Sequence, residues 1–169
     1  IGQAFPYTPI ANPRHFVAEW TFGIQEKELQ KIVDEVRAKG AQAVVLLSHN
    51  GMDVDVKLAG RVRGIDVILG GHTHDGVPLP VIVANSGGRT VVTNAGSNGK
   101  FLAVLDLEVN GKVVDFRYRL LPVFSNLLPP DAEMVALIER VRKPFEEKLQ
   151  KRLAVTEGLL YRRGNFNGT

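Results

Sequence analysis

The sequence predicts a mixed α/β fold in which a parallel βαβ unit is followed by antiparallel strands. Short apolar runs at residues 42–47 and 65–69 suit buried strands, and the amphipathic segment 53–63 between them suits a crossover helix. The Asn110-Gly111 pair between two later apolar runs is typical of a β-hairpin turn. A crossover of this length is sufficient to join two parallel strands.

The other elements follow from local patterns along the chain. Residues 1–23 are rich in proline and aromatic side chains, which predicts an ordered loop with a short extended piece. Apolar residues at helical spacing predict a helix over 25–39, ended by Gly40. After residue 76 we expect four strands, all antiparallel, at 80–84, 89–94, 101–109 and 112–121.

A long amphipathic helix is expected to begin after Asp131, because aspartate is a favoured N-cap residue. Pro144 falls inside this pattern and should kink or break the helix, since proline removes a backbone donor.

Composition excludes several classes of function. An apolar fraction of 44% and a charged fraction of 23% over 169 residues are typical of a globular protein. The absence of cysteine excludes disulfide scaffolds, thiolate zinc sites, iron–sulfur clusters and cysteine nucleophiles. The basic residues behind the net charge of +3 are dispersed, so nucleic-acid binding is not expected. No apolar run approaches the roughly 18 residues of a membrane span, and no signal-peptide pattern is present.

Three of the four histidines lie at the carboxyl ends of the two predicted parallel strands. His49 follows the first strand, and His72 and His74 follow the second. Ligands of open α/β sheets bind at this edge, and neighbouring strands are about 4.8 Å apart. If the second segment is extended, His72 and His74 face the same side. Imidazole is the commonest metal ligand, so these residues predict a metal site, whereas His15 is assigned no role.

Four further residues are expected to shape this site without binding metal. Gly70 and Gly71 allow the backbone to turn sharply ahead of the second histidine pair. Asp75 is placed to accept a hydrogen bond from an imidazole or to fix the loop, and Asn50 adjoins His49.

The residues leave the number of metal ions open. Three imidazoles could form a three-histidine zinc site of the catalytic type, or part of a two-metal site completed by carboxylates from elsewhere. Asp53 and Asp55 lie two apart at a helix start, where interaction with the free amides and the helix dipole explains them.

The segments around the histidines resemble those of a known family. Ser48-His49-Asn50 and Gly70–Asp75 resemble the last two metal-ligand motifs of the calcineurin-like metallophosphatases, in their 5′-nucleotidase branch. Residues 1–14, 48–55 and 94–100 are similar to the SoxB-type thiosulfohydrolases of the bacterial sulfur-oxidation (Sox) system, and this resemblance covers essentially the whole chain.

This resemblance implies a four-layer αββα sandwich with two divalent metal ions, manganese in particular, although zinc and iron suit the same ligands. By motif position, His49 and His72 would bind one ion and His74 the other. The family implies hydrolytic release of sulfate from a cysteine S-thiosulfonate on a sulfur-carrier protein, in the periplasm, by a hydroxide generated at the metals.

The resemblance also implies that the chain is part of a longer protein. The family's earlier motifs, Asp-x-His, a bridging Asp and Asn-His-Glu, do not occur in this sequence. We therefore expect residues 1–125 to be the C-terminal portion of a metallophosphatase domain, with the N-terminal half of that domain as a partner. Residues 126–169 would be a linker helix and the approach to a C-terminal domain. No catalytic acid is identifiable, and the isolated chain is expected to be inactive.

Two alternatives to the thiosulfohydrolase remain open. One is a 5′-nucleotidase or another phosphoesterase, because the histidines that position metal are common to both. The other is a non-catalytic metal-binding module.

Overall fold

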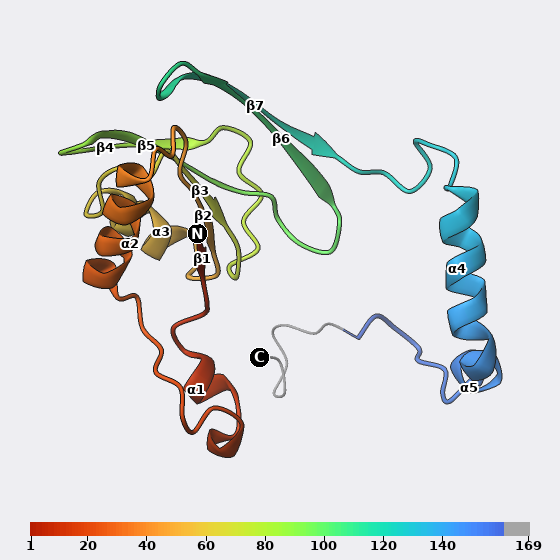
Figure 1. Ribbon diagram of the computed structural model, residues 1–169. Helices are drawn as coiled ribbons and strands as arrows, with labels where there is room; N and C mark the ends of the chain where they lie inside the picture. Colours follow the sequence, from red (N-terminus) through yellow and green to blue (C-terminus); the bar gives the residue numbers. More distant parts are fainter. Residues whose placement is uncertain (161–169) are drawn as a thin grey trace. The chain divides into compact units, whose positions relative to one another are not determined.

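The first 125 residues contain two β-sheets (Figure 1). The computed structural model describes residues 1–160 and divides the chain into two units, Ile1–Ser125 and Asn126–Thr169. The predicted approach to a further domain, at residues 161–169, lies outside the described residues.

The larger sheet has five strands in the order β1-β2-β3-β5-β4. All neighbours are parallel except β4 and β5, which form an antiparallel hairpin. The strands are β1 (Gly2–Gln3), β2 (Val45–Ser48), β3 (Val67–Gly70), β4 (Val81–Asn85) and β5 (Gly88–Asn94).

The predicted βαβ unit is confirmed. Helix α3 (Met52–Ala59) joins β2 to β3, which pair in parallel with Leu46 opposite Ile68. The prediction that every later strand is antiparallel is wrong for β5, which pairs in parallel with β3. Val91 and Val92 of β5 are both buried, as in a central strand covered on two faces, and local turn patterns do not report such a distant partner.

Two helices cover one face of this sheet. Leu46, Ile68 and Val92 are opposite one another across three parallel strands and belong to one buried core. Helix α2 (Glu26–Ala38) adds Leu29 and Val33 to that core, and α3 adds its own apolar residues. The helices thereby hold the strands in register, and with them the strand ends that carry the histidines.

A two-stranded sheet, β6 (Phe101–Val109) and β7 (Val113–Pro122), contacts the five-stranded sheet. Tyr118 Oη accepts a hydrogen bond from Thr93 Oγ1 at 2.7 Å and donates one to the Val77 carbonyl at 2.8 Å. A cavity of about 450 Å³ lies between this hairpin and the ends of β3 and β5. The predicted Asn110-Gly111 hairpin turn is confirmed, with Gly111 at φ +67°.

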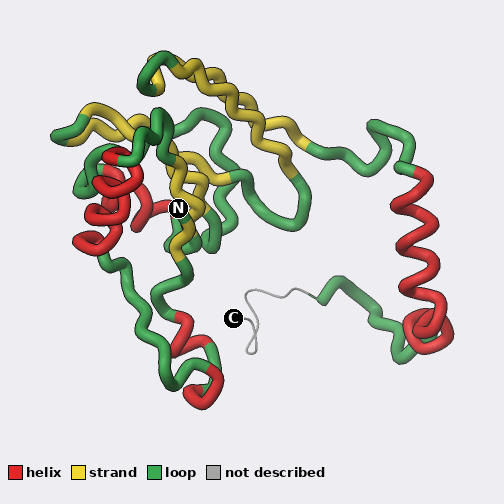
Figure 2. The backbone as a smooth tube through the Cα atoms, viewed as in Figure 1, coloured by secondary structure: helices red, strands yellow, loops and turns green. Residues whose placement is uncertain are grey.

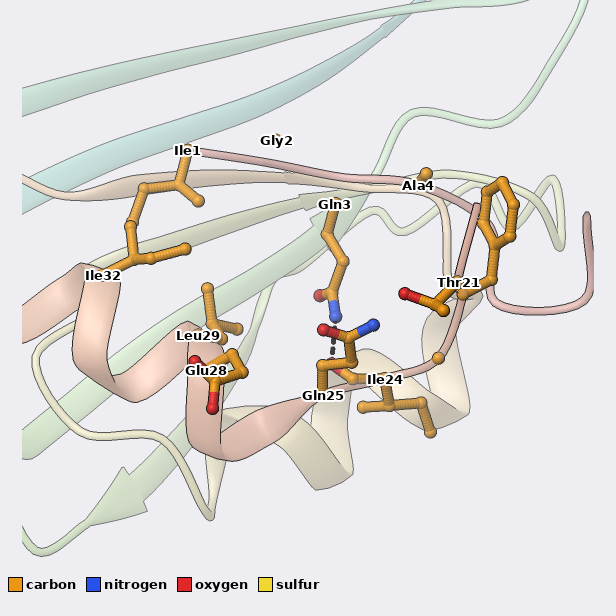
Figure 3. A pocket seen from close by; sticks show the side chains of 12 residues that line it. Ile1, Gly2, Gln3, Ala4, Thr21, Ile24, Gln25, Glu28, Leu29 and Ile32 are labelled. Atoms are coloured by element: carbon orange, nitrogen blue, oxygen red, sulfur yellow. Dashed lines mark hydrogen bonds between the residues drawn. The ribbon is translucent and has the colours of Figure 1, made fainter. Parts of the chain in front are cut away.

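The amino-terminal segment contains more structure than predicted. The short strand β1 is followed by α1 (Thr8–Ala11) and the 3-10 helix η1 (Arg14–Phe16). A pocket of about 230 Å³ lies between β1 and the start of α2, and Figure 3 shows the side chains that line it. Gln3 Nε2 donates to the Ile24 carbonyl across this pocket. Gln3 Oε1 also accepts from Asn50 Nδ2 at 2.9 Å. Gln3 thereby links the sheet edge to the loop after β2.

In the second unit, helices occupy residues 132–150 and loops lie on either side of them (Figure 2). Helix α4 (Ala132–Arg142) begins as predicted, with Asp131 Oδ1 accepting from Met134 N at 2.8 Å. The 3-10 turn η2 (Lys143–Phe145) contains Pro144 and separates α4 from α5 (Glu146–Gln150), which confirms the predicted break. No helix in residues 1–160 has the length and apolar character needed to cross a membrane.

The fold class is therefore mixed α/β, with parallel and antiparallel strand pairs, as the sequence predicts.

Candidate functional site

Two of the predicted site histidines lie side by side where neighbouring parallel strands end. His49 follows β2 directly, and His72 comes two residues after β3. The centroids of the two imidazole rings are 5.2 Å apart, and both side chains are exposed. His74 is also exposed. Within residues 1–160, the two imidazole rings that lie close together are those of His49 and His72, and not that of His74.

The loop that carries His72 and His74 is not extended, contrary to the sequence prediction. Both residues have left-handed backbone conformations, with φ +73° and +60°. Side chains two apart therefore do not alternate as they would in a strand, and the two imidazoles need not face one side. Non-glycine residues in this region carry strain, and such strain gathers at functional sites.

Thr73 holds this loop against the start of α3. Its Oγ1 accepts a hydrogen bond from Met52 N at 3.1 Å and donates one to Asp75 Oδ2. The carbonyl of Asp75 accepts from Gly96 N at 2.7 Å. The contacts of Asp75 are therefore with the loop and with the segment after β5, and its carboxylate accepts from a hydroxyl.

The Phe5 ring packs against both imidazoles. Its centroid lies 4.1 Å from that of His72 and 5.8 Å from that of His49, edge-on to the latter. Sequence patterns favoured a packing role for Phe5 over a place beside the substrate channel, and they did not place it against the histidines. The missing information was the pairing of β1 with β2 in parallel, which brings the residues after β1 to the same sheet edge.

Asp55 is a residue that sequence reasoning placed wrongly. It makes no helix cap; it is fully buried, and its Oδ1 accepts from Ser48 Oγ at 2.5 Å and Asn50 Nδ2 at 3.2 Å. Burial raises the pKa of this carboxyl, and the two hydrogen bonds lower it by less. The pattern that reveals the burial is the helical stripe formed with Leu58, Ala59 and Val62, at i+3, i+4 and i+7.

The two glycines of the β3 loop allow the strand ends to approach closely. A Cβ atom on Gly70 would lie 2.8 Å from Asp55 Oδ2 and 3.2 Å from the Thr93 carbonyl oxygen. A Cβ on Gly71 would lie 3.4 Å from the Ser48 carbonyl oxygen. Gly70 therefore has no room for a side chain, whereas a Cβ atom on Gly71 would make an ordinary van der Waals contact.

Comparisons with known proteins agree on one group of hydrolases. No family model matches the chain. The 5′-nucleotidase of Rattus norvegicus is 35% identical over 127 residues, which is 66% of this chain and 22% of that protein. The snake venom 5′-nucleotidase of Naja atra is 31% identical over 131 residues, which is 68% of this chain and 24% of that protein.

Solved structures give the same relationship over more of the chain. The sulfate thiohydrolase SoxB of Thermus thermophilus is 42% identical with a TM-score of 0.87, over 96% of this chain and 30% of that one. A 5′-nucleotidase precursor, also from Thermus thermophilus, is 28% identical with a TM-score of 0.71, over 79% and 29%. This chain belongs to the 5′-nucleotidase/calcineurin-like phosphoesterase superfamily. It spans 22% to 30% of the length of these four relatives.

Metallophosphatases of this superfamily use divalent metals, and the imidazole pair fits part of such a site. Metal–nitrogen bonds of about 2 Å place two imidazoles on adjacent positions of one ion with ring centroids about 5 Å apart, close to the 5.2 Å between His49 and His72. Within residues 1–160, however, no group of three or more His, Cys, Asp or Glu side chains is arranged to hold an ion. The described residues thus offer two neighbouring ligands and need others to complete a site.

Proposed function

We propose that this chain supplies the histidine face of a two-metal hydrolase that releases sulfate from a cysteine S-thiosulfonate on a sulfur-carrier protein. The observation that carries the proposal is the similarity to SoxB, a sulfate thiohydrolase, over nearly the whole chain. The imidazole pair at the strand ends supports it, because it suits two ligands of one ion.

In this proposal the residues of the chain bind and orient. His49 and His72 bind one ion through their exposed rings, and His74 binds the second from further along the same loop. Bound divalent ions would supply positive charge for an anionic sulfonate oxygen and acidify an attacking water. Phe5 packs against His72 and fixes the plane of its ring. The bridging carboxylate and the remaining ligands come from residues outside these 169.

A phosphoesterase of the 5′-nucleotidase type is the second candidate. It is favoured by the 35% identity to the Rattus norvegicus 5′-nucleotidase, a relative with a different substrate. The discriminating assay uses the complete gene product with each substrate in turn. Release of sulfate from a carrier-bound cysteine S-thiosulfonate supports the first candidate, and release of phosphate from nucleoside monophosphates in its place supports the second.

Single substitutions test whether the histidines hold metal. We expect His49→Ala and His72→Ala to lower the metal content of the purified complete protein, measured by elemental mass spectrometry, and His74→Ala to lower it as well. His15→Ala is the matched control, because His15 is an exposed histidine that packs on Phe16. Metal content indifferent to all three changes would overturn the site. Metal loss without any hydrolase activity in the wild type would indicate a non-catalytic metal-binding module.

We further propose manganese as the native metal and the periplasm as the location. Both rest on the similarity to SoxB, and a 5′-nucleotidase precursor among the similar structures also suits an exported protein. Elemental analysis of the protein from its native host, and fractionation of the same cells, test the two points. Zinc or iron at full occupancy, or a cytoplasmic fraction holding the protein, would contradict them.

A further inference from the structure

A buried carboxylate lies behind the imidazole pair and contacts both loops that carry it. Asp55 is on the inward face of α3 with none of its surface exposed. Its Oδ1 accepts hydrogen bonds from the side chains of Ser48 and Asn50, the two residues that flank His49. Ser48 Oγ in turn accepts from Asn50 N at 3.2 Å. The turn around His49 is therefore fastened to one carboxylate oxygen.

The second oxygen of Asp55 faces the other loop. A Cβ atom on Gly70 would lie only 2.8 Å from Asp55 Oδ2, so this oxygen packs directly against the last residue of β3. Gly70 is followed by Gly71 and then by His72. A Cβ atom on Gly71 would lie 3.6 Å from His49 Nδ1. One side chain thus touches the segments that carry both imidazoles.

The burial of the Asp55 carboxylate is unfavourable for the stability of the fold. Asp55 Oδ2 and Asn50 Oδ1 are buried and have no hydrogen-bond partner among the described residues. A buried oxygen without a donor destabilises the folded state, and such groups in a native fold call for a reason other than stability. The apolar neighbours of Asp55 on the stripe, Leu58 and Ala59, show that an aliphatic side chain would suit the same face of α3.

We propose that Asp55 is a positioning residue: its carboxylate joins the Ser48–Asn50 turn to the Gly70 end of β3 and so fixes the separation of the His49 and His72 imidazoles for a shared metal ion. This proposal rests on the proposed function, in which those two rings bind one ion. Asp55 touches neither ring, and it acts through the residues beside them.

The test compares three variants of the complete gene product. Asp55→Ala removes both oxygens, and Asp55→Asn keeps one oxygen for Ser48 and Asn50. Asp53→Asn is the matched control, because Asp53 is exposed on the same helix two residues earlier. Manganese affinity is measured by competition with a metal indicator. The imidazole signals of His49 and His72 are followed by NMR in the metal-free protein, and stability is measured by urea unfolding.

We expect Asp55→Ala to weaken manganese binding by about 10- to 100-fold, the usual effect of removing a group that orients metal ligands. Its metal-free imidazole signals should shift or broaden. Asp55→Asn should restore most of the affinity, and Asp53→Asn should match the wild type in both readouts. If Asp55→Ala does not fold, the single variants Asp55→Asn and Ser48→Ala decide. Ser48→Ala loses the hydroxyl hydrogen bond to Asp55 and should then show the weakened manganese binding.

The possible failures can be told apart. If His49→Ala and His72→Ala leave manganese affinity unchanged, the proposed site is wrong. If those changes abolish binding while Asp55→Ala binds as the wild type does, with unchanged imidazole signals, Asp55 is a structural residue and the inference is overturned.

Discussion

Burial raises the pKa of the Asp55 carboxyl above its ordinary value of 3.8, because desolvation outweighs the hydrogen bonds from Ser48 and Asn50. The folded protein therefore keeps a proton on Asp55 at pH values where the unfolded chain has lost it. Because the folded state binds more protons, Asp55 makes the free energy of unfolding fall as pH rises from about 3.8 to the raised pKa. Above that pKa the loss is complete and constant.

This sign gives a test by urea unfolding at several pH values. We expect the stability of Asp55→Asn relative to the wild type to increase as pH rises through that window, because the amide carries no titrating proton. Asp53→Asn removes a carboxylate from the exposed side of the same helix, so comparing the two variants isolates the effect of burial. Parallel pH profiles for Asp55→Asn and the wild type would show that the burial of Asp55 has no such consequence.

Gly70 is packed too closely for the position to accept a side chain. Gly70→Ala brings a methyl group to 2.8 Å from Asp55 Oδ2 and 3.2 Å from a backbone oxygen of β5. We expect the free energy of unfolding to fall by about 1–3 kcal/mol, the usual cost of overpacking. In an Asp55→Ala background the cost should be smaller, because one of the two close contacts is gone.

Gly2→Ala is the control for this cycle, since a methyl group there meets nothing within 4 Å and Gly2 is also in a strand. Equal costs of Gly70→Ala in both backgrounds would mean that Asp55 and Gly70 are not coupled.

At the scale of elements, β2 shows how one strand separates core from surface. Leu46 is fully buried against α2 and α3, whereas Leu47 is 58% exposed. We expect Leu46→Ala to lower the free energy of unfolding by about 2–5 kcal/mol, through lost burial and the cavity left behind. Leu47→Ala should cost under about 1 kcal/mol. Similar losses in the two variants, measured by chemical denaturation, would mean that the sheet is covered on its other face in solution.

The order of the helices and strands followed from local patterns, and the structure confirms the βαβ unit, the hairpin and the Pro144 break. Long-range pairing did not follow. The parallel partner of β5 is β3. The residues in and around β5 do not predict this partner, because strand pairing and its register are decided by contacts across the sheet. The same holds for Phe5, whose place beside His72 depends on β1 joining β2.

The histidines at the strand ends were predictable because the end of an apolar run is visible in the sequence. Their roles as ligands remain a prediction. Asp55 was misplaced for a different reason: a carboxylate near a helix start usually caps or faces solvent, and its burial shows only in its spacing from Leu58 and Val62.

For the whole molecule, the candidate site is assembled from segments far apart in the chain. The residues after β1, β2 and β3 meet at one sheet edge because the three strands are parallel neighbours. That edge offers two adjacent imidazoles, and among residues 1–160 no third ligand of the usual types joins them. Two ligands leave most of the coordination sphere of a divalent ion to water.

We therefore expect these 169 residues, produced alone, to bind manganese weakly and to give no sulfate or phosphate release. The reason is ligand number, since a two-metal hydrolase needs carboxylates that bridge and charge-balance the ions. The measurement is manganese titration and turnover for this chain beside the complete gene product at equal concentration. A matched His49→Ala variant of each shows whether any binding is specific. Turnover by the 169 residues that is lost in His49→Ala would overturn this expectation and show that the chain holds a working site by itself.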